Sequence, residues 1–372
     1  MKILITGIHG FVGSNLVEYL KKDNEIYGLD IVAPEKEGVV RTFSWEELLV
    51  DSHVAGAPQN DKEADAHQND IVNDSSDNNI QFDAIIHLAG KAHDTKNKAA
   101  AEVYFKVNTG LTQKIFDYFM ASGVKKFIFF STAKAAADRV EGVLTEDVVP
   151  RPVGPYGESK IKAEEYILSR FKEGESHVAD APQNDKEADA PQNDKEAYVP
   201  RSDKGADVPS SDKQVYIFRP CMIHGPGNKG NLNLLYSVVR KGIPWPLGAF
   251  ENRRTFTSIE NICFAVNGVL TQDVPSGIYN MGDDEALSTN ELIEEICKSL
   301  GKKAHIWRLP KVLMTGIAKI GGWLHLPLNP MRLQKLTESY VSSNAKIKAA
   351  LGIKKMPVDA RDGLKRTLGS FK

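Results

Sequence analysis

Cysteine is scarce in this sequence, which holds only three in 372 residues. They are Cys221, Cys263 and Cys297. Their wide spacing fits neither a disulfide framework nor a cysteine-rich metal cluster, so we expect neither, and we expect a protein of a reducing compartment, the cytoplasm. The histidines come singly from different segments, without the convergent spacing of a metal site, so we expect no bound metal.

Long apolar runs are also absent. No stretch approaches the ~20 residues with which a helix spans a bilayer, so we expect no membrane span. The nearest candidate, residues 312–324, is short and broken by glycines, and we expect a core or lid helix there rather than a helix lying in a membrane interface. The apolar N-terminus is typical of a first strand rather than a secretory leader. Basic residues are not interleaved with aromatic ones, so nothing favours nucleic-acid binding.

A strong net charge is missing as well: the total is −2. The charge is, however, unevenly distributed along the chain. Two polar segments, about 51–79 and 173–213, carry −6 each, so the rest of the chain carries +10. Both contain the same repeat, Ala-Pro-Gln-Asn-Asp-Lys-Glu-Ala, and few large apolar residues. This composition indicates inserted, flexible surface loops without a catalytic role; the alternative is a docking element for a partner. A basic folded body suits an anionic substrate.

Among the features that are present, a glycine-rich turn at residues 7–13 is the most informative. It follows an apolar run at 2–6, predicted to be a buried strand, and precedes a helical apolar pattern. Glycine lets the backbone turn tightly and approach a pyrophosphate, and the helix that follows directs N–H groups and its positive dipole end at the phosphates. The turn therefore predicts a bound dinucleotide. The residues expected to contact it here are Gly7, Gly10, Phe11, Val12 and Gly13.

The second predicted strand, residues 25–30, ends in Asp30, 23 residues after Gly7. A carboxylate at this position can accept hydrogen bonds from the adenosine ribose hydroxyls and would repel a 2′-phosphate. The sequence therefore favours NAD over NADP.

Two further apolar runs, 82–90 and 125–132, fit the same sheet. Residues 101–122 between them carry a helical apolar pattern, formed by Val103, Val107, Leu111, Ile115 and Phe119. Strands that alternate with helices predict a parallel, doubly wound α/β sheet, whose ligands bind beyond the carboxyl ends of the strands. Small residues and hydroxyls lie at those ends of the two runs. The first run ends in Leu88, Ala89 and Gly90, and the second ends in Ser131 and Thr132.

Tyr156 and Lys160 are four residues apart, so on a helix they share one face. A nearby ammonium and a positive nicotinamide ring would lower the pKa of the phenol, so that Tyr156 could act as a general base or acid near neutral pH. Lys160 has a second plausible task, a hydrogen bond to the nicotinamide ribose. Thr132 can donate a hydrogen bond to the substrate oxygen whose proton Tyr156 would take or give. A tyrosine–lysine pair alone is a weak signal, but together with the glycine turn it indicates hydride and proton transfer.

At this point the chain resembles the extended short-chain dehydrogenase/reductases of the nucleotide-sugar epimerase/dehydratase branch, across nearly the whole chain outside the two insertions. The motifs that carry the resemblance are Thr6-Gly7-x-x-Gly10-x-x-Gly13, Asp30, His87-Leu88-Ala89-Gly90, Val107-Asn108-Thr109, Ser131-Thr132, Tyr156-x-x-x-Lys160, Arg219-Pro220 with Gly225-Pro226-Gly227, and Arg254-Thr255-Phe256-Thr257-Ser258-Ile259.

The resemblance implies a Rossmann NAD-binding domain over 1–218 and, mainly over 219–372, a smaller substrate domain from which some segments return to the sheet. It implies Thr132, Tyr156 and Lys160 as the catalytic group. The cofactor-binding set then extends to Asn108, and includes Ser131, Tyr156 and Lys160. Asn231 and Arg254 would bind a UDP-sugar, Arg254 at its diphosphate through a planar fork of donors. A homodimer is possible.

The sequence departs from the family immediately after the catalytic threonine. Members that eliminate water across C5 and C6 carry an acidic pair there, whereas this chain has Ala133 and Lys134. Without an acid and a base, elimination lacks its proton carriers. We therefore expect an NAD-dependent 4-epimerase of a UDP-hexose or UDP-N-acetylhexosamine, most like bacterial polysaccharide-locus enzymes. The alternatives are an NAD(P)H-dependent UDP-4-keto-6-deoxy-sugar reductase and, in another class, a non-catalytic NAD(H)-sensing protein.

Overall fold

The computed structural model describes residues 1–50, 80–91, 100–179, 212–228, 230–323 and 329–371. Its centre is a seven-stranded sheet in the order β10-β7-β5-β4-β1-β2-β3, in which every paired neighbour is parallel. This confirms the predicted doubly wound α/β fold. The strands are β1 (Lys2–Thr6), β2 (Glu25–Leu29), β3 (Arg41–Phe43), β4 (Ala84–His87), β5 (Lys126–Phe130), β7 (Gln214–Pro220) and β10 (Gly277–Met281).

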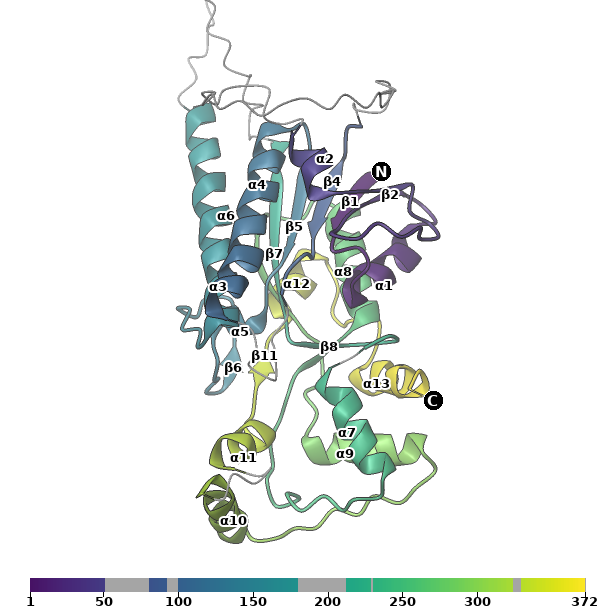
Figure 1. Ribbon diagram of the computed structural model, residues 1–372, viewed down its shortest axis with the longest axis vertical. Coiled ribbons are helices and arrows are strands. Elements are labelled where there is room, and N and C mark those ends of the chain that lie inside the picture. Colours follow the sequence, from purple (N-terminus) through teal and green to yellow (C-terminus); the bar gives the residue numbers. More distant parts are fainter. Residues whose placement is uncertain (51–79, 92–99, 180–211, 229, 324–328, 372) are drawn as a thin grey trace, which may run out of the picture.

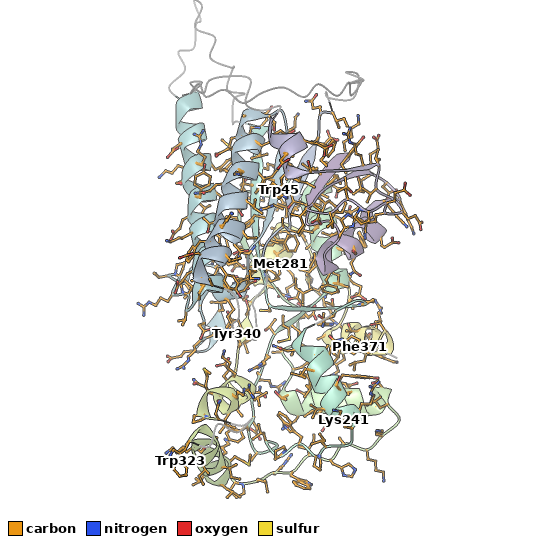
Figure 2. All side chains as sticks on the ribbon, viewed as in Figure 1. Trp45, Lys241, Met281, Trp323, Tyr340 and Phe371 are labelled. Carbon is orange, nitrogen blue, oxygen red and sulfur yellow. The ribbon has the colours of Figure 1, made fainter. Side chains whose placement is uncertain are left out.

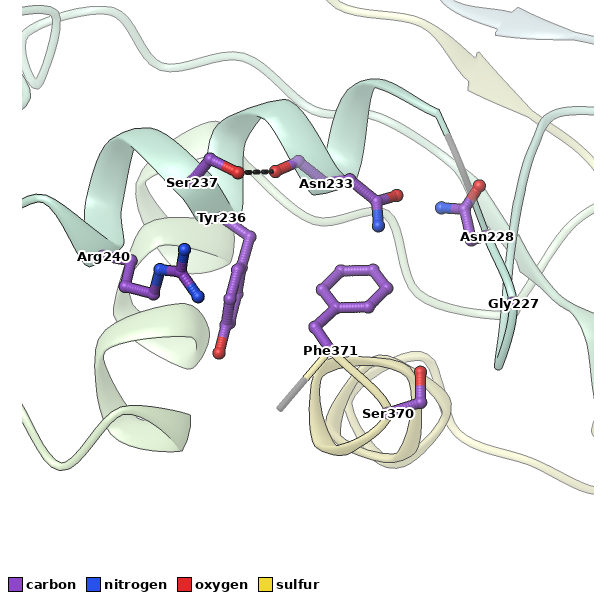
Figure 3. Close-up of a pocket in the computed structure, with 8 residues that line it drawn as sticks. All are labelled: Gly227, Asn228, Asn233, Tyr236, Ser237, Arg240, Ser370 and Phe371. Atoms are coloured by element: carbon purple, nitrogen blue, oxygen red, sulfur yellow. Dashed lines mark hydrogen bonds between the residues drawn. The ribbon is translucent and has the colours of Figure 1, made fainter.

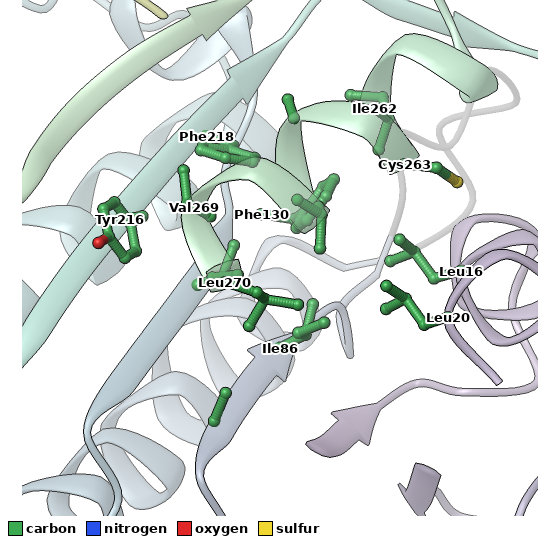
Figure 4. Close-up of a cluster of buried hydrophobic side chains, with 14 of the residues drawn as sticks. Leu16, Leu20, Ile86, Phe130, Tyr216, Phe218, Ile262, Cys263, Val269 and Leu270 are labelled. Carbon is green, nitrogen blue, oxygen red and sulfur yellow. The ribbon is translucent and has the colours of Figure 1, made fainter. Parts of the chain in front are cut away.

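Helices cover both faces of this sheet (Figure 1). On one face lie α1 (Phe11–Leu20) and α8 (Ile259–Thr271), which share a buried apolar cluster with the strands. Figure 4 shows Val269 and Leu270 of α8 in the same cluster as Phe218 of β7 and Leu16 of α1. The other face is covered by α4 (Leu111–Ala121) and α6 (Pro155–Ala179), with the short α2 (Trp45–Val50) nearby. Burial on both faces explains why the strands read as continuous apolar runs.

The single helix predicted over residues 101–122 is divided into three parts. They are α3 (Ala101–Tyr104), a π-helical turn η2 (Phe105–Gly110) and α4. The wide turn shifts the buried face, so Val103, predicted on the apolar stripe, is exposed, whereas Tyr104 and Asn108 are buried. A π-helical turn of this kind often marks a functional site.

The C-terminal half supplies elements to the sheet and also forms a second body at the lower end of Figure 1. There α7 (Asn231–Arg240), α9 (Thr289–Ser299) and α13 (Ala360–Gly369) share one apolar cluster, and α10 (Lys311–Trp323) and α11 (Pro330–Thr337) contribute to another. The small elements are α5 (Ala133–Ala136), α12 (Ala345–Ala350) and the strand pairs β6 (Val143–Leu144) with β11 (Val341–Ser342) and β8 (Met222–His224) with β9 (Phe256–Ser258). The division predicted at residue 218 falls inside β7 and stays a prediction.

The predicted insertions differ in how much of them can be described. Residues 51–79 lie outside the described residues. The second insertion was expected to begin at residue 173, but α6 continues to Ala179, and 180–211 lie outside the described residues. Its last predicted residue, Lys213, is buried: its ammonium donates to the carbonyls of Phe119, Ser122 and Val124 at 2.6–3.0 Å. This lysine lies directly before β7 and closes the C-terminal end of α4, so the expectation of a flexible surface position is wrong for Lys213.

Candidate functional site

The glycine turn forms a tight cradle at the carboxyl end of β1. Gly7 has a positive φ of 68°, and a Cβ atom there would lie 2.9 Å from the backbone nitrogen of Ala89. A Cβ atom on Gly13 would lie 2.7 Å from the carbonyl oxygens of Gly7 and Ile8. Gly10 precedes α1 without any side-chain cap, so the N–H groups of the first turn, at Phe11 and Val12, remain for phosphate oxygens. The cradle therefore fits a dinucleotide pyrophosphate.

Asp30 lies directly after β2, beside this cradle. One of its carboxylate oxygens accepts from the backbone N–H of His9 at 3.2 Å, and the other accepts from Ile31 at 2.8 Å. These bonds fix the carboxylate between the turn and the strand end and leave it further lone pairs. The position suits the adenosine ribose hydroxyls, as expected from the sequence.

A buried polar network lies behind the cradle. The Thr6 hydroxyl accepts from the N–H groups of Leu88 and Ala89 and lies 2.7 Å from His87 Nδ1. The Thr112 hydroxyl donates to the Asn108 carbonyl at 2.6 Å, so it accepts from His87 Nε2, which lies 2.9 Å away. His87 is therefore protonated at Nε2, and its Nδ1 accepts from Thr6.

His87 is thus a neutral connector between two strand ends and the π-helical turn. Burial, with a smaller effect of Lys160, holds the pKa of His87 well below its usual 6.5, which agrees with the neutral ring. No role for this histidine was predicted from the sequence. The only signal was its place, with Thr6, among apolar residues at the ends of predicted buried strands.

Asn108, expected at the cofactor, has its amide group engaged by the protein. Its Oδ1 accepts from the Lys91 N–H at 2.7 Å, and its Nδ2 donates to the Lys91 carbonyl and, at 2.9 Å, to the Ser159 hydroxyl. A Cβ atom on Gly90 would lie 2.9 Å from Asn108 Oδ1 and 3.3 Å from Lys160 Nζ. The structure therefore joins the chain after β4 to the helix that carries Tyr156 and Lys160.

Tyr156 lies in the first turn of α6, where its phenol hydrogen-bonds Thr132 and its ring lies 6.3 Å, centroid to centroid, from that of Tyr104. Thr132 itself is the N-cap of α5, at the end of β5. The two groups expected to share a substrate oxygen are therefore together. Burial raises the pKa of Tyr156 above its usual 10, more than the Thr132 bond lowers it. The lowering was predicted with the nicotinamide ring beside the phenol, and it stays a prediction for the NAD-bound enzyme. In the protein alone burial opposes the phenolate.

Lys160 is buried one turn further along α6. Its ammonium donates to the Phe130 carbonyl at 2.8 Å and lies 4.7 Å from the centre of the Phe129 ring. Burial lowers the pKa of Lys160 to about 8, although the nearby Glu164 acts to raise it. An amine with this pKa exchanges its proton near physiological pH.

Ser131 faces away from the cradle, into a buried ion pair. Its hydroxyl donates to Glu164, and the Arg219 guanidinium donates to both oxygens of the same carboxylate at 2.5–3.1 Å. The pair is almost completely buried. Sequence reasoning missed Glu164, although its spacing of four residues from Lys160 places both on one helical face. The negative charge of Glu164 acts to raise the pKa of Lys160 and so stabilises its ammonium form.

The two residues that replace the acidic pair of the dehydratases begin α5. Ala133 is buried in a small cluster with Ala136, Ala137 and Leu144. The Lys134 ammonium donates to the carbonyl and the carboxylate of Asp138 and lies 4.8 Å from the centre of the Tyr340 ring. Neither side chain supplies a carboxyl group beside Thr132.

The two residues expected to bind substrate lie in the C-terminal half. Asn231 is the first residue of α7 and is exposed; no described contact joins it to Thr132 or Tyr156. The Arg254 guanidinium donates to the carbonyls of Lys335 and Glu338, at the end of α11, and lies 3.9 Å from the Glu338 carboxylate. Arg254 therefore holds the end of α11 in place.

A hollow of about 300 Å³ opens between α7 and the residues that follow α13 (Figure 3). Asn228, Tyr236 and Arg240 help to line it, facing Phe371. It contains none of the residues expected at the site. Among the described residues no group of three or more histidine, cysteine or acidic side chains could hold a metal ion. No helix of the described residues is both long and apolar enough to cross a membrane.

Residues 3–179 match the model of the NAD dependent epimerase/dehydratase family. A UDP-glucose 4-epimerase of Klebsiella pneumoniae is 31% identical over 144 residues, which are 37% of this chain and 94% of that sequence. The chain belongs to this NAD-dependent enzyme family, whose cofactor the cradle and Asp30 fit.

The more extensive similarities are to sugar 4-epimerases. A UDP-glucose 4-epimerase of Vibrio cholerae is 28% identical over 83% of this chain and 78% of its own. An N-acetyl-alpha-D-glucosaminyl-diphospho-ditrans,octacis-undecaprenol 4-epimerase of Escherichia coli O157:H7 is 24% identical over 83% of this chain and 75% of its own. The solved UDP-N-acetylglucosamine 4-epimerase of Bacillus cereus superposes with a TM-score of 0.64 at 18% identity, over 99% of this chain and 98% of that one. That superposition supports the same fold.

Proposed function

We propose that the protein is an NAD-dependent epimerase that inverts C4 of a UDP-hexose or UDP-N-acetylhexosamine. One observation carries the proposal: Thr132, Tyr156 and Lys160 meet at the end of β5, beside a dinucleotide cradle, without a carboxyl group at position 133 or 134. The set can move a proton next to a hydride and lacks the groups for elimination. We also propose that the enzyme forms a homodimer. Light scattering of the purified protein tests this.

In this proposal the glycine cradle and Asp30 would hold NAD, which would supply a hydride acceptor and donor for C4. Tyr156 removes the proton of the C4 hydroxyl and later gives it back to the same oxygen. Thr132, whose hydroxyl bonds the phenol in the protein alone, would turn its one O–H to that oxygen and hold it in line. Lys160 keeps a positive charge one turn below the phenol and stabilises the phenolate. Between loss and return of the hydride the 4-keto sugar would rotate in the site. Its other face would then receive the hydride, which inverts C4.

The first experiment incubates the purified enzyme with UDP-N-acetylglucosamine and follows the products by NMR without added cofactor. We expect interconversion of the gluco and galacto forms, with C6 still oxygenated. UDP-glucose is the matched second substrate. A 6-deoxy-4-keto product would contradict the argument from Ala133 and Lys134, and no reaction with either UDP-sugar would contradict the proposal.

A second candidate substrate is an N-acetylhexosamine on a polyprenyl diphosphate, like the substrate in the name of the Escherichia coli relative. The observation that favours it is the attachment of Arg254, proposed at the diphosphate, to α11, which lies next to an apolar, solvent-exposed helix, α10. An arginine fork recognises the same two phosphates on a nucleoside or on a lipid. Parallel reactions with UDP-N-acetylglucosamine and its polyprenyl-diphosphate counterpart in detergent decide between them by their relative kcat/KM.

A further inference from the structure

Helix α10 is apolar on two opposite faces. Its inner face, with Met314 and Ala318, packs against Leu247 and Leu333. A core or lid helix was predicted here, but a second apolar face is turned to solvent: Val312 and Trp323 are 85% and 81% exposed. The exposed apolar residues of the helix are Val312, Leu313, Ile317, Ile320 and Trp323. Their spacing places them along one side of the helix, opposite the packed side.

The exposed apolar residues continue onto α11, where Met331 and Leu336 are exposed. Figure 1 shows α10 and α11 side by side at the end of the molecule away from the sheet. In Figure 2 Trp323 lies at the outer edge of this end. We call the exposed side of residues 311–323 and 330–337 the α10–α11 face.

The charged residues of α10 and α11 have one sign only. Between residues 302 and 337 the sequence contains no aspartate or glutamate. The same stretch contains seven basic residues, all exposed: Lys302, Lys303, Arg308, Lys311, Lys319, Arg332 and Lys335.

We propose that the α10–α11 face docks on an anionic phospholipid bilayer, with α10 lying in the plane of the interface. Apolar side chains on one side of a helix, a tryptophan at its end and basic residues without acidic ones nearby are the features of helices that bind in this way. The aliphatic side chains and Trp323 enter the boundary between headgroups and acyl chains. The lysines and arginines contact the lipid phosphates.

Charge favours a bilayer over a second copy of the chain on this face. Two copies joined through it would bring two sets of four cations together (Lys311, Lys319, Arg332 and Lys335) without an acidic partner on either helix, and like charges across an interface are unfavourable. A bilayer that contains anionic lipid offers the opposite charge over the whole area. Docking would also bring the end of α11, and the Arg254 that binds it, close to the membrane surface.

The test measures binding of the full-length protein to sedimented vesicles. We expect binding to phosphatidylcholine vesicles that contain phosphatidylglycerol and weaker binding to pure phosphatidylcholine. Binding should fall steeply at about 1 M salt, where the screening length is only about 3 Å. The triple variant Val312→Gln, Ile320→Gln, Trp323→Gln should lose about tenfold or more in partition coefficient. Its NAD affinity and circular dichroism report that it is folded.

The matched control replaces three exposed aliphatic residues outside the face: Val40→Gln, Val143→Gln and Val149→Gln. It should bind vesicles like the wild type. The double variant Lys311→Gln, Lys319→Gln tests the charge separately and should weaken binding several-fold, even if the apolar triple variant fails to fold. Trp323→Phe should still bind, but the vesicle-induced blue shift of tryptophan fluorescence should largely disappear.

Three results would overturn the proposal. The wild type could stay in the supernatant with anionic vesicles. The wild type and both face variants could bind equally, so that another surface makes the contact. The apolar triple variant could convert an oligomer to a monomer while vesicle binding is absent throughout, in which case the face belongs to a second copy of the chain. The vesicle assay needs no substrate, so its failure leaves the epimerase proposal standing.

Discussion

Replacing Glu164 by glutamine should change how the activity depends on pH, because Glu164 supports the Lys160 ammonium. In the proposed reaction the active form holds a phenolate at Tyr156 and an ammonium at Lys160. That form has one proton fewer than the fully protonated pair, so activity should rise with pH as this proton leaves. In the protein alone the first proton leaves at about pH 8, since the pKa of Lys160 is lowered to about 8 and that of Tyr156 is raised.

The magnitude follows from the buried ion pair. Glu164 acts to raise the pKa of Lys160, so its loss lowers that pKa, by about one unit for a buried charge nearby. One unit corresponds to about 1.4 kcal/mol. The rising limb should therefore move to lower pH, and the plateau should fall by up to about tenfold, because the pair then favours phenol and neutral amine over phenolate and ammonium.

The measurement is kcat/KM of the NAD-loaded enzyme between about pH 6 and 9, by NMR of the two sugar epimers. Glu165→Gln, exposed on the same helix, is the matched control and should leave the profile unchanged. Arg219 loses its partner in Glu164→Gln, which should cost about 3–5 kcal/mol of stability, so assays belong well below the melting temperature. A lower plateau with an unmoved limb would assign Glu164 a purely structural role and refute the reasoning.

Tyr156→Phe should lower kcat by about 10²–10⁴ and leave NAD affinity nearly unchanged, because only the proton carrier is lost; calorimetry and NMR rates test both parts. Gly13→Ala should weaken NAD binding at least ~10-fold, since its Cβ would lie 2.7 Å from two carbonyl oxygens, whereas Gly110→Ala meets no atom closer than 3.9 Å and should bind normally. Asp30→Ala should relax the preference for NAD over NADP in the same titration. Lys213→Met should cost about 1–3 kcal/mol in urea unfolding without changing kcat, because three carbonyls lose their donor.

Much of the sheet could be predicted because its strands are buried on both faces and read as short apolar runs. The runs at 2–6, 25–30 and 125–132 correspond to β1, β2 and β5 within one or two residues. The helix pattern failed at 101–122, where the π-helical turn inserts an extra residue into the repeat and moves the buried face from Val103 to Tyr104. A periodicity argument assumes one helical repeat, so it cannot detect such a turn.

The site was predictable where a motif carries its own chemistry, as at the glycine turn and at Tyr156 and Lys160. The pKa shifts of Tyr156 and Lys160 were not predictable in this way. The sequence suggested that a neighbouring ammonium lowers the pKa of Tyr156, but burial acts on both groups and dominates both shifts. Desolvation depends on the atoms that surround a group in space, which spacing along the chain does not reveal.

The buried polar network also explains how two motifs about 150 residues apart can act as one unit. From the end of β1 the hydrogen bonds run through the Thr6 hydroxyl, the His87 ring and the Thr112 hydroxyl to the Asn108 carbonyl, and the Asn108 amide continues to Ser159 on α6. The Ser159 hydroxyl in turn donates to the carbonyl of Tyr156 at 3.0 Å. The five residues lie on five separate elements, so nothing in the sequence marks them as members of one network. Because a buried hydrogen-bonding group left unpaired is costly, the members fix one another's positions, and the cradle and the phenol are held in one geometry.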